Sequence, residues 1–195
     1  MIAGIILAAG ASSRMGSPKA LLDYRGETFV ERLVRLFSRV CNPVIVVLGE
    51  HPEPIRARVE GRAEIVINPD PDRGQLSSLQ TGLAAVPPKA DGFLFTTVDC
   101  PAVEPETVSQ IVARFKRRDP ATLLVIPAYR GRHGHPVCAA SALADEFLAL
   151  SPKAQARDVV HRHLAETVYI EVDDAGILVD VDDAETYRRM TEKLQ

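Results

Sequence analysis

The sequence predicts a three-layer, Rossmann-like α/β fold built around a mostly parallel sheet. Short, continuous runs of β-branched and other apolar residues recur along the chain, which is typical of strands that are covered on both faces. Segments with helical periodicity lie between these runs, and this alternation implies right-handed crossovers between parallel strands. The 195 residues suit one domain, 1–195, with one substantial core.

The expected strands begin at the N-terminus and are bounded by turn residues. In the first two thirds of the chain they are Ile2–Ala8, Pro43–Gly49, Glu64–Ile67, Phe93–Val98 and Thr122–Pro127. A glycine-bearing turn at Tyr129–Gly134 then leads into a return strand at His135–Ala139. We therefore expect one antiparallel strand in the sheet. The remaining expected strands are Thr167–Val172 and a short one near Ile177–Val181.

The helix with the clearest start is expected at Thr28–Val40, where the apolar residues form one stripe. Thr28 and Glu31 have the spacing of a capping box. The other expected helices are Ser78–Val86, Pro105–Arg117, Ser141–Leu150, Ala154–Leu164 and a last one from Asp183.

Composition excludes several classes of protein. The net charge is −3 and Trp is absent, which argues against nucleic-acid binding. Cys41, Cys100 and Cys138 form no CxxC pair, so neither a disulfide framework nor a zinc knuckle is expected. The apolar run at residues 1–10 lacks a basic flank and is too short to span a bilayer. We expect a cytoplasmic protein without a membrane partner.

The segment from Leu7 to Leu22 directly follows the first expected strand. It is rich in Gly, Ala and Ser, so its backbone amides can approach a ligand closely, and it carries Arg14 and Lys19. Open α/β sheets bind ligands at such a carboxyl edge. The segment matches neither a Walker A loop nor a GxGxxG fingerprint.

The sequence LAAGASSRMGSPK in this segment resembles the signature of the MobA-like NTP transferases. The resemblance continues through GQLSSLQTG (74–82), VDCP (98–101), GRHGHPV (131–137), AQARDVV (154–160) and VDVDDAETY (179–187). It implies a nucleotidyltransferase fold and a Mg2+-dependent enzyme. Such an enzyme moves a nucleoside monophosphate from an NTP onto a phosphorylated small molecule and releases pyrophosphate.

Two carboxylates are expected to hold the Mg2+ cofactor. Asp99 stands at the end of an expected strand, where a carboxylate-bound ion can neutralise charge on the phosphoryl oxygens. The second ligand is expected among Asp180, Asp182 and Asp183, and the resemblance favours Asp182. The alternative is that Asp182 caps the last helix, with Glu185 at capping-box spacing, but Asp182 can bind the metal while Asp183 caps the helix. The alternative for Asp99 is a role in capping the turn before Pro101.

The resemblance also implies roles for the remaining polar positions. Arg14 and Lys19 would hold the β- and γ-phosphates, and they join Asp99 and Asp182 as catalytic residues. The nucleotide-binding residues would be Leu7, Ala8, Ala9, Gly10, Ser13, Arg14, Lys19, Gly74, Ser77 and Ser78. Ser77 or Ser78 has an alternative role as a helix cap, with Gln80 at capping-box spacing from Ser77. His135 and Arg157 would bind the acceptor, or else are exposed polar residues.

The histidines do not predict a zinc site. His133 and His135 form an HxH pair without a third zinc ligand at suitable spacing. His161 and His163 are expected at the surface.

The first choice of substrates is CTP and molybdopterin-bound molybdenum, because LAAG resembles the cytidylyl-transferring branch. The alternatives are a guanylyltransferase for the same cofactor and a sugar- or polyol-phosphate nucleotidyltransferase. A non-catalytic nucleotide-binding chaperone of a molybdoenzyme is a further alternative, and a molybdoenzyme is the possible protein partner.

Overall fold

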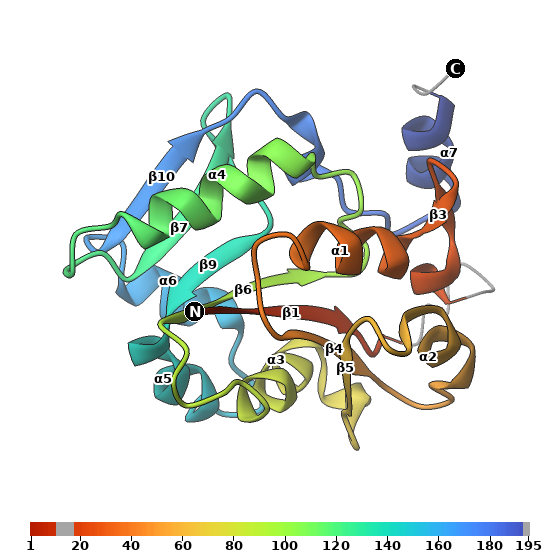
Figure 1. Ribbon diagram of the computed structural model, residues 1–195, viewed down its shortest axis with the longest axis horizontal. Coiled ribbons are helices and arrows are strands. Elements are labelled where there is room, and N and C mark those ends of the chain that lie inside the picture. The colour runs from red at the N-terminus through yellow and green to blue at the C-terminus, as the bar shows by residue number, and fades with distance from the viewer. Residues whose placement is uncertain (11–17, 193–195) are drawn as a thin grey trace.

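The computed structural model describes residues 1–10 and 18–192 (Figure 1). The strands are β1 (Ile2–Ala8), β2 (Asp23–Tyr24), β3 (Glu27–Thr28), β4 (Val44–Leu48), β5 (Glu64–Ile67), β6 (Gly92–Thr97), β7 (Leu124–Tyr129), β8 (Arg132–His133), β9 (Val137–Ala140) and β10 (Thr167–Glu171). The α-helices are α1 (Phe29–Phe37), α2 (Glu53–Val59), α3 (Gln75–Ala84), α4 (Pro105–Lys116), α5 (Ala144–Leu148), α6 (Ala156–Arg162) and α7 (Ala184–Glu192). Short 3-10 helices are η1 (Lys19–Leu21), η2 (Pro71–Arg73), η3 (Ser141–Leu143) and η4 (Ala175–Leu178).

The central sheet is mixed and mostly parallel, as predicted. Its main order is β10-β7-β9-β6-β1-β4-β5, with the short β8 paired to β7. The β1–β4, β1–β6, β4–β5 and β7–β10 pairs are parallel. The expected return strand β9 runs antiparallel to both β6 and β7, and β8 adds a third antiparallel pairing, with β7.

Helices cover both faces of the sheet and give the predicted three layers (Figure 1). Because side chains alternate along a strand, β1 contributes side chains to the core on both faces of the sheet, and it is buried along its whole length. Ile2 and Ile6 pack with α1 and α4, whereas Ile5 and Leu7 pack with α3. This double coverage explains why the strands read as continuous apolar runs.

Helix α3 lies unusually close to the sheet. A Cβ atom added to Gly82 would lie 2.6 Å from the Ile5 side chain and 3.0 Å from that of Val47. Glycine therefore lets the helix sit directly on β1 and β4, which fixes its N-terminus next to the carboxyl end of β1.

The helix starts agree with the sequence prediction in part. The capping box of α1 is present, with Glu31 N–H donating to the Thr28 hydroxyl and Thr28 N–H donating to the Glu31 carboxylate. Helix α3 begins at Gln75 rather than Ser78, with Gly74 as its N-cap and no side-chain cap bond among the described residues. The predicted serine cap is therefore wrong.

The segment expected as a short strand at residues 177–181 is wrong as well, because residues 175–178 form η4. Asp174 explains the difference, since its carboxylate accepts hydrogen bonds from Gly176 N–H and Glu104 N–H, both at 2.8 Å. This cap closes a tight turn and ties it to the start of α4.

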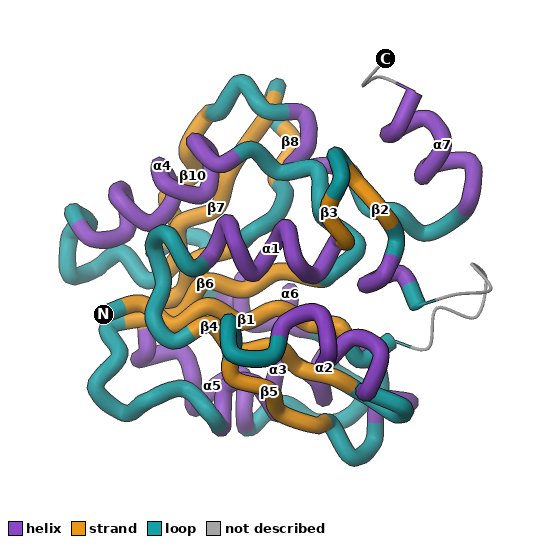
Figure 2. The backbone as a smooth tube through the Cα atoms, turned by 45° about the vertical axis from the view of Figure 1, so that its right-hand side comes forward, coloured by secondary structure: helices purple, strands orange, loops and turns teal. Residues whose placement is uncertain are grey.

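The C-terminal helix packs against the hairpin formed by β2 and β3 (Figure 2). The Tyr187 hydroxyl donates to the Asp23 carbonyl at 2.8 Å, and the Tyr187 ring lies 6.0 Å from that of Phe29. Helix α7 thereby fixes the segment that precedes it, which carries Asp180 and Asp182.

Within the described residues, no helix combines the length and the apolar character needed to cross a membrane.

Candidate active site

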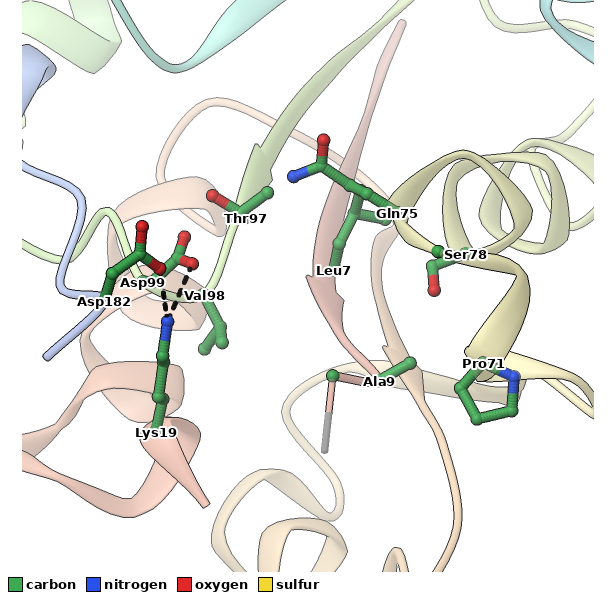
Figure 3. Close-up of a pocket in the computed structure, with 12 residues that line it drawn as sticks. Leu7, Ala9, Lys19, Pro71, Gln75, Ser78, Thr97, Val98, Asp99 and Asp182 are labelled. Carbon is green, nitrogen blue, oxygen red and sulfur yellow. Dashed lines mark hydrogen bonds and ion pairs between the residues drawn. The ribbon is translucent and has the colours of Figure 1, made fainter. Parts of the chain in front are cut away.

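The carboxyl ends of β1 and β6 place two predicted site segments next to each other. The strands are parallel neighbours with Leu7 opposite Thr97, and Val98 N–H donates to the Leu7 carbonyl at 3.0 Å. The described residues that follow β1, Ala9 and Gly10, therefore lie at the same edge of the sheet as Asp99 (Figure 3). This is the edge at which open α/β sheets bind ligands.

Lys19 and the two predicted metal ligands form one cluster (Figure 3). The Lys19 ammonium lies 2.6 Å from Asp182 Oδ1 and 3.4 Å from Asp99 Oδ2. Burial lowers the pKa of Lys19, but the hydrogen bonds and charges of Asp182 and Asp99 outweigh it, so the pKa is raised overall. Asp99 and Asp182, which lie 80 and 163 positions after Lys19 in the sequence, thus meet at its ammonium group.

The candidates for the second carboxylate divide into two roles. Asp183 accepts a hydrogen bond from Thr186 N–H at 2.7 Å, which is the predicted cap of the last helix. Val181 is buried, and its N–H donates to the Asp99 carbonyl at 2.9 Å. Asp180 and Asp182 stand on either side of Val181, and their carboxylates reach the same region: Asp180 Oδ1 lies 2.8 Å from Cys100 Sγ, and Asp182 Oδ1 lies 2.6 Å from the Lys19 ammonium.

Cys100 joins this cluster, a role that sequence reasoning missed. Its thiol lies 2.8 Å from Asp180 Oδ1 and 3.8 Å from Asp99 Oδ1. Burial, and then the charges of Asp180 and Asp99, raise the pKa of the thiol well above its usual value. One ligand atom from each of the three residues lies within 4.8 Å of the others, so the group is suited to a metal ion. The only sequence signal was the position of Cys100 directly after Asp99.

A cavity of about 360 Å³ opens between β1, β6 and the start of α3 (Figure 3). Its lining residues are Leu7, Ala9, Gly10, Lys19, Pro71, Gly74, Gln75, Ser78, Thr97, Val98, Asp99 and Asp182. Gly74 has φ +88°, a conformation that favours glycine, and it turns the chain into α3. The N-terminus of this helix therefore faces the cavity, where its amides favour a polar or anionic ligand.

The side chain of the buried Asn68 binds the hydroxyl groups of both Ser77 and Ser78. Its side-chain amide donates to the Ser77 hydroxyl at 2.9 Å and to the Ser78 hydroxyl at 3.0 Å. The Ser77 hydroxyl contacts the Gly74 carbonyl at 2.8 Å, so Ser77 braces the start of the helix. Ser78 lines the cavity, whereas Ser77 does not. Ser77 and Ala8 are both buried, and their predicted contact with the nucleotide remains a prediction.

A second cavity of about 540 Å³ adjoins the first and shares Leu7, Gln75 and Thr97 with it. Its lining is mainly apolar and aromatic, and it includes both predicted acceptor residues, His135 and Arg157. Its other lining residues are Leu79, Phe95, Ile126, His133, Gly134, Val137, Gln155, Ala156, Val160, His161, Leu164 and Tyr169.

Two aromatic contacts shape this second cavity. The rings of His133 and Tyr169 stack with centroids 3.9 Å apart and planes 13° apart. The His135 ring meets Phe95 edge-on at 6.4 Å. Burial lowers the pKa of His135, against the opposing charges of Asp180 and Asp99. This shift favours the neutral imidazole, and its buried Nδ1 has no hydrogen-bond partner among the described residues.

The remaining predicted site residues divide as follows. Ser13 and Arg14 lie outside the described residues. His161, expected at the surface, is exposed but lines the second cavity. His163 is less exposed than predicted, because its Nε2 lies 2.8 Å from a Glu146 carboxylate oxygen.

Comparison with known proteins gives the family of the chain. Residues 4–168 match the MobA-like NTP transferase domain. The probable molybdenum cofactor guanylyltransferase of Bacillus cereus (strain Q1) is 31% identical over 134 residues, which cover 67% of this chain and 63% of the relative. The match thus spans less than two thirds of that relative's length. Nicotine blue oxidoreductase of Paenarthrobacter nicotinovorans is 32% identical and covers 97% of this chain and 96% of its own.

Solved structures share the whole fold. Rv0371c of Mycobacterium tuberculosis H37Rv superposes with a TM-score of 0.86 at 29% identity, covering 98% of both chains, and a second structure of it contains manganese. A nucleotidyl transferase from Methanothermobacter thermautotroptrophicus gives a TM-score of 0.83 at 26% identity, covering 99% of this chain and 97% of that one. With the family match over residues 4–168, these findings show that the chain belongs to the MobA-like NTP transferase family, a family of nucleotidyltransferases.

Proposed function

We propose that the chain transfers CMP from CTP to the phosphate of a molybdenum-bound pterin cofactor and releases pyrophosphate, with Mg2+ as its metal. The observation that carries this proposal is the cluster of Lys19, Asp99 and Asp182 at the edge of the first cavity. A cation and paired carboxylates beside the carboxyl end of β1 suit the binding of a metal–triphosphate complex.

The donor set fits a divalent ion. Asp99 and Asp182 approach closely enough that one ammonium contacts both, so these two carboxylates would hold one Mg2+. When bound, Mg2+ neutralises charge that develops on the phosphoryl and pyrophosphate oxygens. The manganese-containing structure of Rv0371c supports a divalent metal in this fold.

The side chains of the protein mainly position the reactants. In the proposed reaction, Lys19 leaves the carboxylates and binds the β- and γ-phosphates together with Arg14. Asp99 and Asp182 then face the metal instead of the ammonium. The acceptor phosphate is already ionised at neutral pH, so in-line attack on the α-phosphorus needs no protein base.

The second cavity supports an acceptor that contains a planar ring. The stacked His133 and Tyr169 and the edge-on Phe95 suit a flat heteroaromatic group. Arg157 suits the attached phosphate. A sugar or polyol phosphate would leave many hydroxyl groups against apolar walls, so this alternative is less well supported.

The choice of base rests on the resemblance of LAAG to cytidylyltransferases. GTP is the rival, favoured by the relative from Bacillus cereus that is named a guanylyltransferase. Thermal-shift measurements with the four NTPs and Mg2+ separate them, because a ligand at about 100 times its Kd stabilises a protein by about 2.7 kcal/mol. We expect the largest shift with CTP. A larger shift with GTP would overturn the choice of base and keep the reaction class.

An oxidoreductase is a second candidate, because the relative from Paenarthrobacter that matches over nearly the whole chain carries that name. The apolar second cavity would also accept an aromatic redox substrate. Hydride transfer, however, gives no role to the cluster of Lys19, Asp99 and Asp182, whereas nucleotidyl transfer uses all three.

Pyrophosphate release distinguishes the two reactions. The protein is mixed with CTP or GTP, Mg2+ and molybdopterin-bound molybdenum, and pyrophosphate is measured with a coupled enzyme assay. We expect release that depends on the acceptor and is lost on adding EDTA. Absence of release with every NTP, together with oxidation of NADH or NADPH by an aromatic acceptor, would refute the proposal.

A further inference from the structure

The carboxylate of Asp99 faces two different neighbourhoods. Its Oδ2 atom lies 3.4 Å from the Lys19 ammonium, on the side of Asp182. Its Oδ1 atom lies 3.8 Å from the sulfur of Cys100, on the side of Asp180. The two oxygens therefore border two separate cation positions, and the proposed function uses only the position next to Asp182.

The second position has the donor set of a mixed sulfur–oxygen metal site. Cys100 Sγ lies 2.8 Å from Asp180 Oδ1, and the ligand atoms of Asp99, Cys100 and Asp180 lie within 4.8 Å of one another. Metal–sulfur and metal–oxygen bonds are about 2.3 and 2.0–2.2 Å long, so ligands on opposite sides of one ion lie about 4.5 Å apart. The observed spacing therefore suits a single ion.

The backbone holds these donors in place. Cys100 N–H donates to the Thr97 carbonyl at 3.3 Å, and Val181 N–H donates to the Asp99 carbonyl at 2.9 Å. The first bond fixes the turn that follows β6, and the second fixes the segment that carries Asp180. The three side chains therefore start from a preformed arrangement, which lowers the cost of binding an ion.

His135 provides a separate observation on the same side of the site. Its Nδ1 atom is buried without a hydrogen-bond partner among the described residues. Asp180 and Asp99 are close enough for their charges to act on its ring. A buried, unsatisfied imidazole nitrogen on which two carboxylates act is a feature expected near an ion that prefers nitrogen and sulfur ligands.

We propose that Cys100, with Asp99 and Asp180, binds a thiophilic divalent ion such as Zn2+, Co2+ or Cd2+ in preference to Mg2+. Thiolate ligands select such ions, whereas Mg2+ requires oxygen ligands and keeps its waters. The thiol proton leaves to solvent when the ion binds. This inference shares Asp99 with the proposed Mg2+ site, but it does not rest on the nucleotidyl transfer reaction.

Titration with Co2+ tests this inference without an activity measurement. A thiolate ligand produces a near-ultraviolet sulfur-to-cobalt charge-transfer band, and visible d–d bands report any bound Co2+. We expect both sets of bands in the unaltered protein. In Cys100→Ser and Cys100→Ala the charge-transfer band should disappear, and the affinity for Cd2+ should fall at least about 10-fold. Loss of a residue that only supports a metal ligand already lowers metal affinity by about 10- to 100-fold, so loss of a ligand should cost at least as much.

Cys41→Ser is the matched control, because Cys41 is a buried thiol outside the site. It should retain the charge-transfer band. Mn2+ binding and the thermal midpoint, measured on every variant, show that the fold and the carboxylates are intact. Visible bands without a charge-transfer band in the unaltered protein would overturn ligation by Cys100 and leave the Mg2+ proposal standing. Absence of both Co2+ and Mn2+ binding, with or without CTP, would overturn both.

Discussion

Replacing Lys19 with Met should tighten metal binding in the nucleotide-free protein while it abolishes most turnover. In the structure the Lys19 ammonium lies between the carboxylates of Asp99 and Asp182, at the position assigned to the divalent ion. A metal ion must therefore displace this ammonium before it can bridge the carboxylates. Met retains the length of the side chain and removes only its charge.

The expected size of the effect follows from the two contacts and their exposure. Two unit charges about 4 Å apart interact by about 1 kcal/mol in water and about 4 kcal/mol at an effective dielectric constant near 20. The side chains of Lys19 and Asp99 are 15% and 24% exposed, but that of Asp182 is 65% exposed, so solvent screens the shorter contact strongly. We take about 1–2 kcal/mol in total, which corresponds to about 5- to 30-fold tighter Mn2+ binding.

Electron paramagnetic resonance of free Mn2+ measures this affinity directly. Lys89→Met is the matched control, because Lys89 is exposed and precedes β6, at the opposite end of that strand from Asp99. The control should leave Mn2+ affinity unchanged. With CTP present, Lys19→Met should lower kcat by about 100- to 10,000-fold, as for the loss of a phosphate clamp. Unchanged or weaker Mn2+ binding by the nucleotide-free variant would refute this arrangement.

Three further predictions follow from the structure. Asn68→Ala leaves the buried hydroxyls of Ser77 and Ser78 without their donor, so the free energy of unfolding should fall by about 1–3 kcal/mol in urea denaturation, and an unchanged midpoint would contradict the bracing role. Arg157→Ala should raise the KM for the acceptor and leave the Kd for CTP unchanged in calorimetry, whereas a weaker Kd for CTP would place Arg157 at the nucleotide instead. Because burial lowers the pKa of His135, its contribution to stability is fully present above pH 6.5 and is lost as pH falls through the lowered pKa. His135→Gln should therefore reduce the loss of stability that the protein shows on acidification. An unchanged loss in the variant would show that another group causes it.

The strands could be predicted well because they are buried on both faces. Every residue of β1, β4 and β6 is buried, and such strands produce uninterrupted apolar runs. Helix α2 was missed because only Ile55 and Val59 of its residues are buried, which leaves too short an apolar stripe to recognise. Residues 177–179 are apolar like a strand, but the cap supplied by Asp174 bends them into η4.

The site residues likewise differ in how clearly the local sequence indicates them. Asp99 and Lys19 could be predicted as site residues because each stands within a compact motif next to a strand end. The contact of Cys100 with Asp180 joins residues 80 positions apart and depends on how the segment before α7 crosses the end of β6. The stacking of His133 on Tyr169 likewise depends on the β7–β10 pairing, so spacing in the sequence carries no signal for it.

The most direct test of the central claim is a crystal structure with Mn2+ and a non-hydrolysable CTP analogue, using the anomalous signal of manganese to locate the ion. We predict a manganese peak bridging Asp99 and Asp182, the triphosphate along the loop that follows β1, and Lys19 moved from the carboxylates onto the phosphates. A nucleotide bound with Lys19 still between the two carboxylates and no manganese beside Asp99 would contradict the assignment.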